Sequence, residues 1–264
     1  MQSYRGADSM PTNSKVVIRP VKPTEAEQAA RLDAKAYGFG REGLPASIPA
    51  DIFSQVADPR LGNPGILIGA FASEKLVGYY LVLLGRNRTC NFAATVVDHE
   101  YNADGQKGIG TMLNIAAMSE AYTLGYSTAI STVAPQNFTN LVLTINKLEW
   151  RITGYAPDKY GKGEDRFYIE KQLLGENPAK EYREKMASQL ASPTGKLVFL
   201  GNGQKETKNQ GMLDNHARNV LMETDWSSVE GSMIVYDTKK VARRDGKSDF
   251  SNVDFYLLLE AKRI

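Results

Sequence analysis

The sequence between residues 91 and 124 constrains the fold of this chain more than any other part. Residues 91–97 (NFAATVV) are typical of a strand, because they combine an aromatic side chain with β-branched ones. Residues 108–124 place apolar side chains at the spacing of a helix, and Gly125 supplies the residue type that commonly ends one. The pattern therefore predicts a strand, a turn and a helix in immediate succession.

The turn, residues 102–110, contains glycines at positions 105, 108 and 110. Because glycine has no Cβ, the backbone N–H groups of such a turn can point into one space. The first turn of the following helix adds unpaired N–H donors and a partial positive charge. Together these features predict a site for a pyrophosphate group, with Lys107 as an additional cationic contact.

The first two thirds of the chain alternate between strand and helix patterns. Strands are expected at residues 15–19, 66–72, 75–84, 91–97, 127–133, 150–154 and 166–171. Helices are expected at residues 24–36, 51–56, 108–124 and 138–148. This order predicts an α/β fold in which helices flank a mixed central sheet.

The pattern changes after residue 174. Residues 175–178 (GENP) are typical of a boundary. Helices are expected beyond it at residues 179–190 and 215–223, and strands at residues 196–200, 232–236 and 253–259. We expect a flexible segment at 1–14, a main domain at 15–174 and a C-terminal extension or small domain at 175–264. Because the last part is short for an independent core, it either forms a small domain or packs on the first part.

The composition excludes several classes of partner. With 32 basic and 30 acidic residues the formal net charge is +2, which gives no electrostatic basis for binding a nucleic acid or a membrane surface. The longest apolar runs, such as residues 79–84, have the length of a strand and cannot span a bilayer. The single cysteine, Cys90, rules out an internal disulfide and a cysteine-based metal cluster, and its strand context predicts burial. We expect a cytoplasmic protein without a bound metal.

The residues around the glycine turn resemble the GNAT superfamily of CoA-dependent N-acyltransferases. Four features match this superfamily in its order, over about residues 15–174. They are an opening strand at 17–20, a central hairpin at 66–84, a pyrophosphate motif at 97–101 with 105–110, and Asn137 ahead of the last main helix. The resemblance implies a GNAT-like mixed sheet with acetyl-CoA, or another acyl-CoA, as co-substrate. It implies transfer of an acetyl group to a primary amine by direct attack, without a covalent enzyme intermediate.

The resemblance also implies which residues hold the coenzyme. Val96 and Val97 match the positions at which a strand bulge supplies a backbone N–H to the thioester carbonyl, and they would align the pantetheine arm. Asn137 would contact that arm further along. The pyrophosphate is expected on Gly105, Gln106, Lys107, Gly108, Ile109, Gly110 and Thr111. Gly105 takes the place of the arginine or glutamine that usually begins the motif, so the contact would rest mainly on backbone donors.

The acid that protonates the leaving thiolate is not at its usual place. Many members of the superfamily have a tyrosine where this chain has Ile145, and a Gly-Phe pair where it has Glu149-Trp150. Tyr160 is the expected replacement acid, with Tyr155 as its neighbour in sequence. The alternative is that both tyrosines only pack or line the cleft.

The base that accepts the proton of the ammonium group is expected at the end of the strand at 91–97. His99 and Glu100 are the candidates, and histidine titrates near neutrality, so it needs little adjustment for this role. The alternative is that Asp98 and Glu100 form a solvated strand end and that His99 is a structural side chain.

Two other functions stay open at this point. The first is an N-acyltransferase whose donor is a longer acyl-CoA or an acyl carrier protein. The second is a CoA-binding regulatory protein that has lost transfer chemistry. Ile145 and Glu149-Trp150 favour the second of these. The acceptor is expected to be a small-molecule or peptide amine, and the sequence leaves room for a homodimer.

Overall fold

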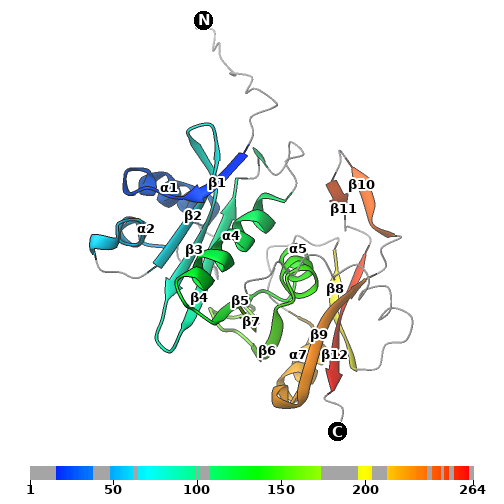
Figure 1. The fold of residues 1–264 in the computed structure, drawn as a ribbon. Helices are drawn as coiled ribbons and strands as arrows, with labels where there is room; N and C mark the ends of the chain where they lie inside the picture. The colour runs from blue at the N-terminus through cyan, green and yellow to red at the C-terminus, as the bar shows by residue number, and fades with distance from the viewer. Residues whose placement is uncertain are drawn as a thin grey trace, which may run out of the picture.

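A seven-stranded mixed sheet forms the larger part of the structure (Figure 1). The computed structural model describes residues 16–37, 48–61, 65–98, 100–101, 108–173, 196–203, 213–236, 240–244, 247–249 and 253–261. The strands are β1 (Val16–Pro20), β2 (Gly65–Ala72), β3 (Lys75–Leu84), β4 (Thr89–Val97), β5 (Thr128–Val133), β6 (Arg151–Ala156) and β7 (Arg166–Gln172). Their order is β1-β2-β3-β4-β5-β7-β6, and only β4 and β5 are parallel neighbours. The mixed α/β sheet predicted from the sequence is confirmed.

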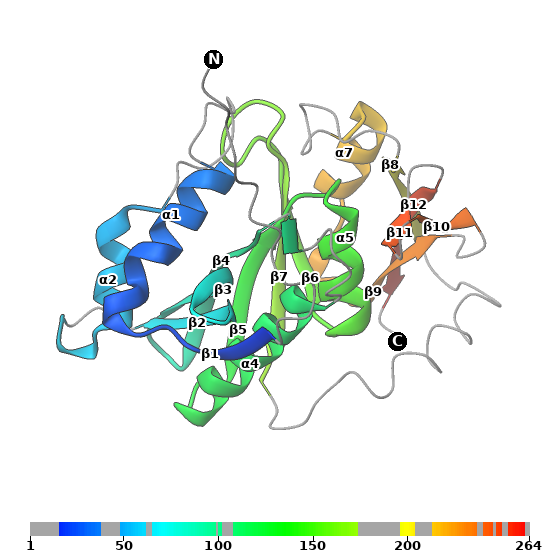
Figure 2. The same cartoon turned by 90° about the horizontal axis from the view of Figure 1, so that it is seen from above.

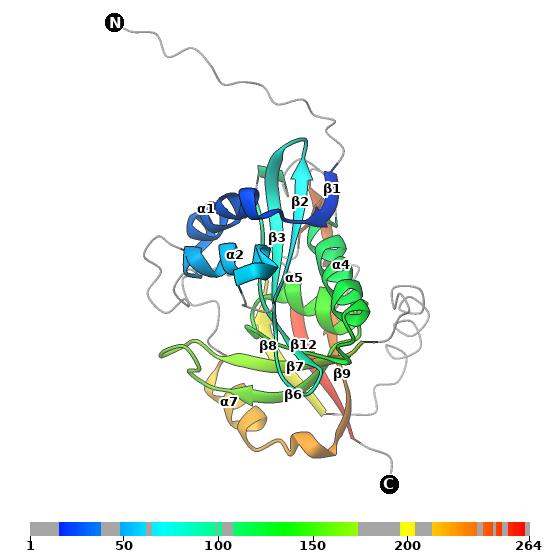
Figure 3. The ribbon, with the colours of Figure 1, turned by 60° about the vertical axis from the view of Figure 1, so that its left-hand side comes forward.

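Helices cover both faces of this sheet (Figures 2 and 3). They are η1 (Pro23–Glu25), α1 (Ala26–Tyr37), α2 (Ala50–Ala57), η2 (Pro59–Leu61), α4 (Ile109–Thr123), α5 (Phe138–Leu141) and η3 (Val142–Lys147). Helices α1 and α2 lie on one face of β2 and β3, and α4 lies on the other. The helices expected near residues 24–36, 51–56 and 108–124 are therefore confirmed.

The alternation of side chains along β3 explains this two-sided packing. Successive residues of a strand point to opposite faces. Tyr79 lies under α1 and α2, where its ring meets the edge of Phe53 at a centroid distance of 5.2 Å. Tyr80 lies on the face of α4, in the cluster that contains Leu113. Two adjacent tyrosines thus anchor two separate layers of helix.

The parallel pair β4 and β5 separates along its length. Their register pairs only residues 89–91 with 128–130, although β4 continues to Val97 and β5 to Val133. On its other side β4 stays paired with β3, but the register shifts so that Ala94 faces Leu81 and Phe92 faces Val82. Ala93 is the extra residue of this bulge, and a bulge bends the strand that carries it. A gap therefore opens between the carboxyl ends of β4 and β5.

The helical segment after β5 is less regular than the sequence predicts. A single helix was expected over residues 138–148, but one α-helical turn, α5, passes into the π-helical segment η3. The N–H of Leu148 donates to the carbonyl of Leu143, five residues earlier. A spacing of 3.6 in apolar residues does not distinguish these two helix types over so few turns, and short π-helical segments are frequent at functional sites.

The C-terminal segment contributes a second, antiparallel sheet of three strands. They are β8 (Lys196–Asn202), β9 (Val229–Tyr236) and β12 (Asp254–Ala261), in the order β8-β12-β9. Helix α7 (Asn215–Met222) and the turn η5 (Trp226–Ser228) precede β9, and β10 (Ala242–Arg244) pairs with β11 (Lys247–Asp249). The strands and the helix expected at 196–200, 215–223, 232–236 and 253–259 are confirmed. The sequence analysis missed β10 and β11, and the helix expected at 179–190 lies outside the described residues.

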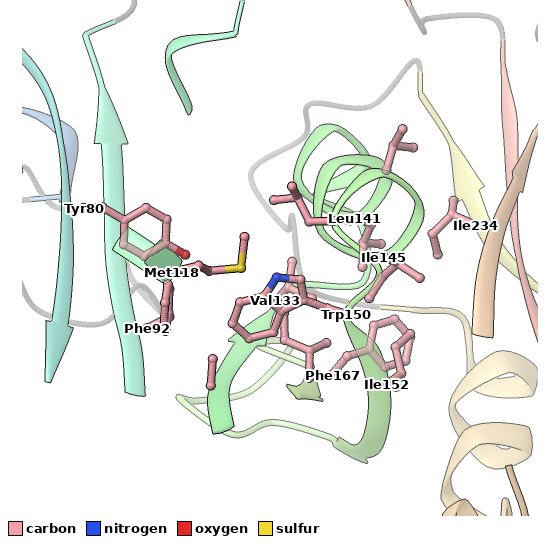
Figure 4. Close-up of a cluster of buried hydrophobic side chains, with 14 of the residues drawn as sticks. Tyr80, Phe92, Met118, Val133, Leu141, Ile145, Trp150, Ile152, Phe167 and Ile234 are labelled. Atoms are coloured by element: carbon pink, nitrogen blue, oxygen red, sulfur yellow. The ribbon is translucent and has the colours of Figure 1, made fainter. Parts of the chain in front are cut away.

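The two sheets share one apolar core, which includes the side chains shown in Figure 4. Ile234 of β9 belongs to the same buried cluster as Trp150 and Phe167 of the first part. Phe138 stacks on Phe255 with their ring centroids 4.0 Å apart. The division of the chain at residues 174 and 175 stays a prediction, but most buried apolar side chains of the described C-terminal strands belong to the main cluster, while Met233 and Leu258 form a small separate one. Among the described helices, none is both long and apolar enough to cross a membrane.

Asn146 joins the two parts by paired hydrogen bonds. Its side-chain amide donates to the carbonyl of Ile234 at 2.8 Å and accepts from the N–H of the same residue at 2.9 Å. Both groups are buried, and a buried polar group that lost its partner would cost about 1–3 kcal/mol. The segment η3 thereby fixes the position of β9.

Candidate functional site

A cavity of about 490 Å³ occupies the gap between β4 and β5. Residues 93–95 and Val97 line it from β4, and residues 131–133 line it from β5. Its volume lies within the range of small-molecule sites, about 300–1,000 Å³. Because the two strands stop pairing here, backbone groups on their facing edges are available to a ligand.

The first turn of α4 belongs to the same cavity. Gly110 lines it, and Gly108 begins the helix with φ at +93°, a left-handed conformation that favours glycine. Gly108 has no side chain with which to cap the helix, and a Cβ placed on it would meet nothing within 4 Å. The N–H groups in the first turn of a helix have no partner within that helix. This arrangement suits an anion at one end of the cavity.

The two valines expected to contact the coenzyme point in opposite directions. Val97 lines the cavity, whereas the side chain of Val96 is buried on the other face of the sheet with Tyr79. The bulge expected at Val96 and Val97 lies instead at Ala93, since Val96 and Val97 pair regularly with Tyr79 and Gly78. Nothing in the run Phe92-Ala-Ala-Thr95 marks a bulge in the sequence, so its position was carried over from the resemblance and was wrong.

The middle of the predicted pyrophosphate turn lies outside the described residues. The residues concerned include Gly105, Gln106 and Lys107. The candidate base His99, which precedes the turn, also lies outside the described residues. Gly108, Ile109, Gly110 and Thr111 are described and begin α4. The side chain of Ile109 lies on the buried face of α4, so any contact that Ile109 makes with a ligand would come from its backbone.

The carboxylates at the end of β4 are tied to Lys35 of α1. The Lys35 ammonium lies 3.1 Å from Oδ2 of Asp98 and 3.6 Å from Oε1 of Glu100. Burial raises the pKa of Asp98, but Lys35 and the N–H of Glu100 outweigh it and hold this pKa below its ordinary value. Asp98 is only 5% exposed, so a solvated strand end is wrong for this residue. Glu100 is exposed and is not among the residues that line the cavity.

Tyr160 does line the cavity, from the connection between β6 and β7. Its hydroxyl lies 3.4 Å from that of Thr132 on β5. The ring is 45% exposed, and the guanidinium of Arg166 stands 5.0 Å from its centroid. Tyr155, by contrast, donates a hydrogen bond to Asp165, and burial raises the pKa of its hydroxyl further. Of the two tyrosines considered from the sequence, Tyr160 is the one at the cavity.

Three charged side chains line the cavity that the sequence analysis did not single out. Glu164 and Arg166 are both buried and form an ion pair of 2.9 Å. Asp33 of α1 is fully buried, accepts a hydrogen bond from the Tyr79 hydroxyl, and accepts another from the N–H of Ile48 at 2.7 Å. No sequence motif surrounds these residues. A partial signal for Glu164 and Arg166 was their position at the start of the strand predicted at 166–171, with Arg166 as its first residue.

Asn114 is a further polar group that faces the cavity. It is 2% exposed on α4, and its amide donates to the Tyr80 hydroxyl at 3.3 Å. Its Oδ1 atom is buried and has no hydrogen-bond partner among the described residues. Buried polar atoms in proteins are nearly always satisfied. An amide oxygen in this state, at the surface of a cavity, suits a ligand that donates an N–H. A polar residue on the buried face of an otherwise apolar helix was the available signal.

Asn137 lines the cavity and also begins α5. Its side-chain oxygen accepts a hydrogen bond from the N–H of Asn140 at 3.2 Å, which is the usual role of a helix N-cap. Ile145, where a tyrosine would supply the acid, points away from the cavity. It is 4% exposed and lies in the core between Trp150 and Ile234 (Figure 4). Glu149 has φ at +56°, which explains why glycine is favoured at this position in proteins of similar pattern.

Among the described residues, Cys90 does not form a nucleophilic site and the acidic side chains do not form a metal site. Cys90 is fully buried, and burial raises the pKa of its thiol to about 11, so it is not a nucleophile at neutral pH. The described residues include no group of three or more histidine, cysteine or carboxylate side chains that could hold a metal ion.

Comparison with known proteins finds similar folds among solved structures but no similar sequence among family models or curated proteins. No family model and no curated protein matches the sequence. Solved structures do match: yncA from Salmonella typhimurium, solved with its cofactor acetyl-CoA, has a TM-score of 0.51 at 16% identity, over 64% of this chain and 99% of that one. An N-acetyltransferase from Staphylococcus aureus and a GNAT-family acetyltransferase from Streptococcus pneumoniae each give a TM-score of 0.51 at 16% identity. Each match covers 61% of this chain and 100% of that chain.

These structures match over nearly their whole length, whereas more than a third of this chain has no counterpart in them. Identity at this level shows an arrangement of elements and not a shared substrate. This chain therefore has the fold of the GNAT superfamily of acetyltransferases.

Proposed function

We propose that this chain is an N-acyltransferase that moves an acetyl group from acetyl-CoA to a primary amine. The observation that carries the proposal is that one cavity joins the first turn of α4 to the separated edges of β4 and β5. A ligand with phosphates at one end and a reactive group at the other fits this geometry. The yncA structure, which has the same fold, holds acetyl-CoA.

The coenzyme would be held mainly by backbone groups. Residues 105–111 would receive the pyrophosphate at the start of α4, where N–H donors and the helix dipole favour negative charge. Val97 and Asn137 would contact the pantetheine arm, because both line the cavity. The unpartnered Oδ1 of Asn114 would accept a hydrogen bond from one of the amide N–H groups of that arm.

The thioester would lie near the bulge of β4. Ala93 and Ala94 line the cavity at the point where the strand is bent. A backbone N–H in this position would polarise the thioester carbonyl as negative charge develops on its oxygen. We therefore place this role at Ala93 or Ala94, and leave Val97 as a contact to the arm.

The transfer itself needs two proton movements. The neutral amine nitrogen attacks the carbonyl carbon, the new C–N bond forms, and the C–S bond breaks with its electron pair on sulfur. Glu164, one of the two cavity carboxylates, would take the proton from the amine, and Tyr160 would give one to the departing sulfur. Glu100 is occupied by Lys35 outside the cavity, and His99 stays a prediction.

The acceptor is proposed to be a small-molecule or peptide amine. Asp33 and Glu164 place two carboxylates at the cavity against one guanidinium, that of Arg166. This balance favours a cationic acceptor over an anionic one. A homodimer stays a prediction from the sequence.

Two alternatives have particular support. Phe92, Val133 and Leu143 give the inner end of the cavity an apolar wall, which would also accept a longer acyl chain. The burial of Ile145 favours a protein that binds CoA without transferring an acyl group, since the usual acid is missing.

The test is a pair of measurements on the whole chain. Calorimetric titration measures CoA binding, and a thiol-reactive dye measures release of CoA from acetyl-CoA across a panel of small-molecule and peptide amines. We expect binding and amine-dependent thiol release. Binding without release from any amine would support the non-catalytic alternative, and the absence of binding would contradict the proposal. Mass spectrometry of co-purified thioesters separates acetyl from longer donors.

A further inference from the structure

The C-terminal segment reaches the cavity wall through Arg218 of α7. The Arg218 guanidinium lies 2.7 Å from Oδ2 of Asp158 and 3.2 Å from Oδ1 of Asp165. Both carboxylates belong to the connection between β6 and β7, and α7 lies beside this end of the hairpin (Figures 2 and 3). One side chain from the C-terminal segment therefore bridges two residues of a loop that precedes it by more than 50 positions.

The loop at 157–165 is closed around these two carboxylates. Oδ1 of Asp158 accepts from the N–H of Gly163 at 2.6 Å, and Oδ1 of Asp165 accepts from the N–H of Asp158 at 3.0 Å. Asp158 has φ at +51°, which an aspartate adopts at a small cost. The loop thus folds back on itself through both carboxylates, of which that of Asp165 is fully buried and that of Asp158 is exposed.

Arg218 supplies the positive charge that this arrangement requires. Asp165 is fully buried, and it also accepts hydrogen bonds from the Tyr155 hydroxyl and from the N–H of Leu213. Two carboxylates held this close repel one another, and a buried carboxylate without a counter-charge is strongly unfavourable. The N–H of Gly163 and the guanidinium of Arg218 hold the pKa of Asp158 below its ordinary value.

The same loop carries the charged wall of the cavity. Tyr160 lies within it, and Glu164 directly precedes Asp165 in the chain. Arg166 donates to the backbone carbonyl of Asp165 at 2.7 Å and pairs with Glu164 at 2.9 Å. A shift of the Asp165 backbone would consequently move both members of the ion pair that faces the cavity.

We propose that Arg218 is a positioning residue for the acceptor side of the transferase site. It holds Asp158 and Asp165, and through them it sets the places of Tyr160, Glu164 and Arg166. The C-terminal segment is by this account a part of the site. The expected effect on turnover rests on the proposed function, whereas the effect on the loop does not.

The first experiment measures hydrogen exchange of the full chain and its Arg218→Ala variant. We expect exchange at the amides of Gly163 and Glu164, which donate hydrogen bonds within the loop, to accelerate about tenfold or more, while α4 keeps its protection. Asn219→Ala is the matched control, because Asn219 is exposed on the same helix and its side chain has no role in the network. Unchanged loop exchange in a folded Arg218→Ala protein would overturn the proposal.

A milder variant guards against loss of folding. Asp158→Asn keeps a residue that tolerates a positive φ and keeps an oxygen for the N–H of Gly163, but it removes the charge that pairs with Arg218. We expect it to accelerate exchange in the loop less than Arg218→Ala does. Exchange that rises equally in the loop and in α4 would indicate a general loss of stability and contradict a positioning role.

The second experiment separates the two substrates. In Arg218→Ala we expect the KM for the amine to rise about tenfold or more and the calorimetric Kd for CoA to stay unchanged, because the coenzyme lies against α4 and β4. Arg218→Lys should recover part of the loss, since an ammonium keeps the charge but not both contacts. Equal loss for both substrates would overturn the proposal. If the unaltered chain transfers nothing to any amine, the proposed function fails, and the exchange measurement still decides the role of Arg218.

Discussion

The two walls of the cavity present different chemical groups. The wall formed by β4 and the start of α4 presents small side chains and backbone, such as Ala93, Ala94 and Gly110. The wall formed by the β6–β7 connection presents an aromatic ring and a buried ion pair, those of Tyr160, Glu164 and Arg166. The first wall suits a ligand that is recognised by its shape and its phosphates. The second wall suits a ligand that is recognised by its charge.

The two walls also differ in what holds them. The first lies in two short runs of the sequence, 93–97 and 108–114, and β4 pairs with β3 on both sides of the bulge at Ala93. The second depends on Arg218, which lies far away in the sequence. A site made in this way can keep its coenzyme contacts while its acceptor contacts change with the C-terminal segment. The following changes are ordered from the largest expected effect to the smallest.

Glu164→Gln should affect the charged wall alone. Replacing the carboxylate by an amide removes the proposed proton acceptor, so we expect kcat to fall about 100-fold or more. The Kd for CoA should not change, because Glu164 lies on the opposite wall. Steady-state kinetics and calorimetry measure the two quantities. A loss of CoA binding in this variant would show that the two walls are not independent.

Tyr160→Phe should have a smaller effect on the same wall. The phenylalanine keeps the ring beside Arg166 but removes the hydroxyl, and we expect kcat to fall about tenfold. The loss is limited because a thiolate can also leave toward solvent. Tyr155→Phe is the comparison variant, because the Tyr155 hydroxyl donates a hydrogen bond to Asp165 and does not line the cavity. If kcat is the same in Tyr160→Phe and in the unaltered chain, Tyr160 is not the acid.

Asn114→Ala tests the coenzyme wall. If the buried Oδ1 atom accepts a hydrogen bond from the pantetheine arm, CoA should bind about fivefold to tenfold more weakly in the variant. Calorimetric titration gives the Kd, and thermal unfolding without CoA reports the cost to the fold. Ser119, exposed further along α4, offers a control in Ser119→Ala. An unchanged Kd would remove Asn114 from the coenzyme site.

The pair of Lys35 and Asp98 predicts a modest dependence of stability on pH. The pKa of Asp98 is lowered in the folded chain, so the pair stabilises the fold above the unfolded pKa and this contribution is lost as the pH falls through the folded value. Because Lys35 is half exposed, we expect a contribution of about 1 kcal/mol or less. The free energies of unfolding in urea of the chain and of Lys35→Met should differ near pH 6, and the difference should shrink as the pH falls below the ordinary pKa of an aspartate, about 3.9. A difference that persists at the lower pH would contradict this assignment.

Most elements of the mixed sheet were predictable because their signals are local. The hairpin of β2 and β3 and the helix α4 each follow from the spacing of apolar residues within one segment. The start of α4 at Gly108 was predictable from the glycine-rich sequence before it, whereas the role of this turn in binding a coenzyme stays a prediction. The bulge at Ala93 was not, since a run of small and β-branched residues accommodates a bulge at more than one position.

The charged wall was largely hidden from the sequence for a physical reason. Glu164 and Arg166 gain their role only when the loop closes on Asp158 and Asp165, and that closure depends on Arg218. Contacts across more than 50 residues leave no periodicity that a sequence can show. Tyr160 was found because it follows the last helix of the main sheet, and Asp33 was missed because it sits in an ordinary helical pattern.

The most direct test of the account compares two glycines at the two ends of α4. Gly108 and Gly125 both have positive φ and open space around the missing Cβ, so Gly108→Asp and Gly125→Asp impose similar backbone strain and the same charge. We predict that calorimetric titration with CoA will show a Kd about 100-fold weaker for Gly108→Asp, because the new carboxylate faces the pyrophosphate, and little change for Gly125→Asp. Equal affinities in the two variants would contradict a pyrophosphate site at the start of α4.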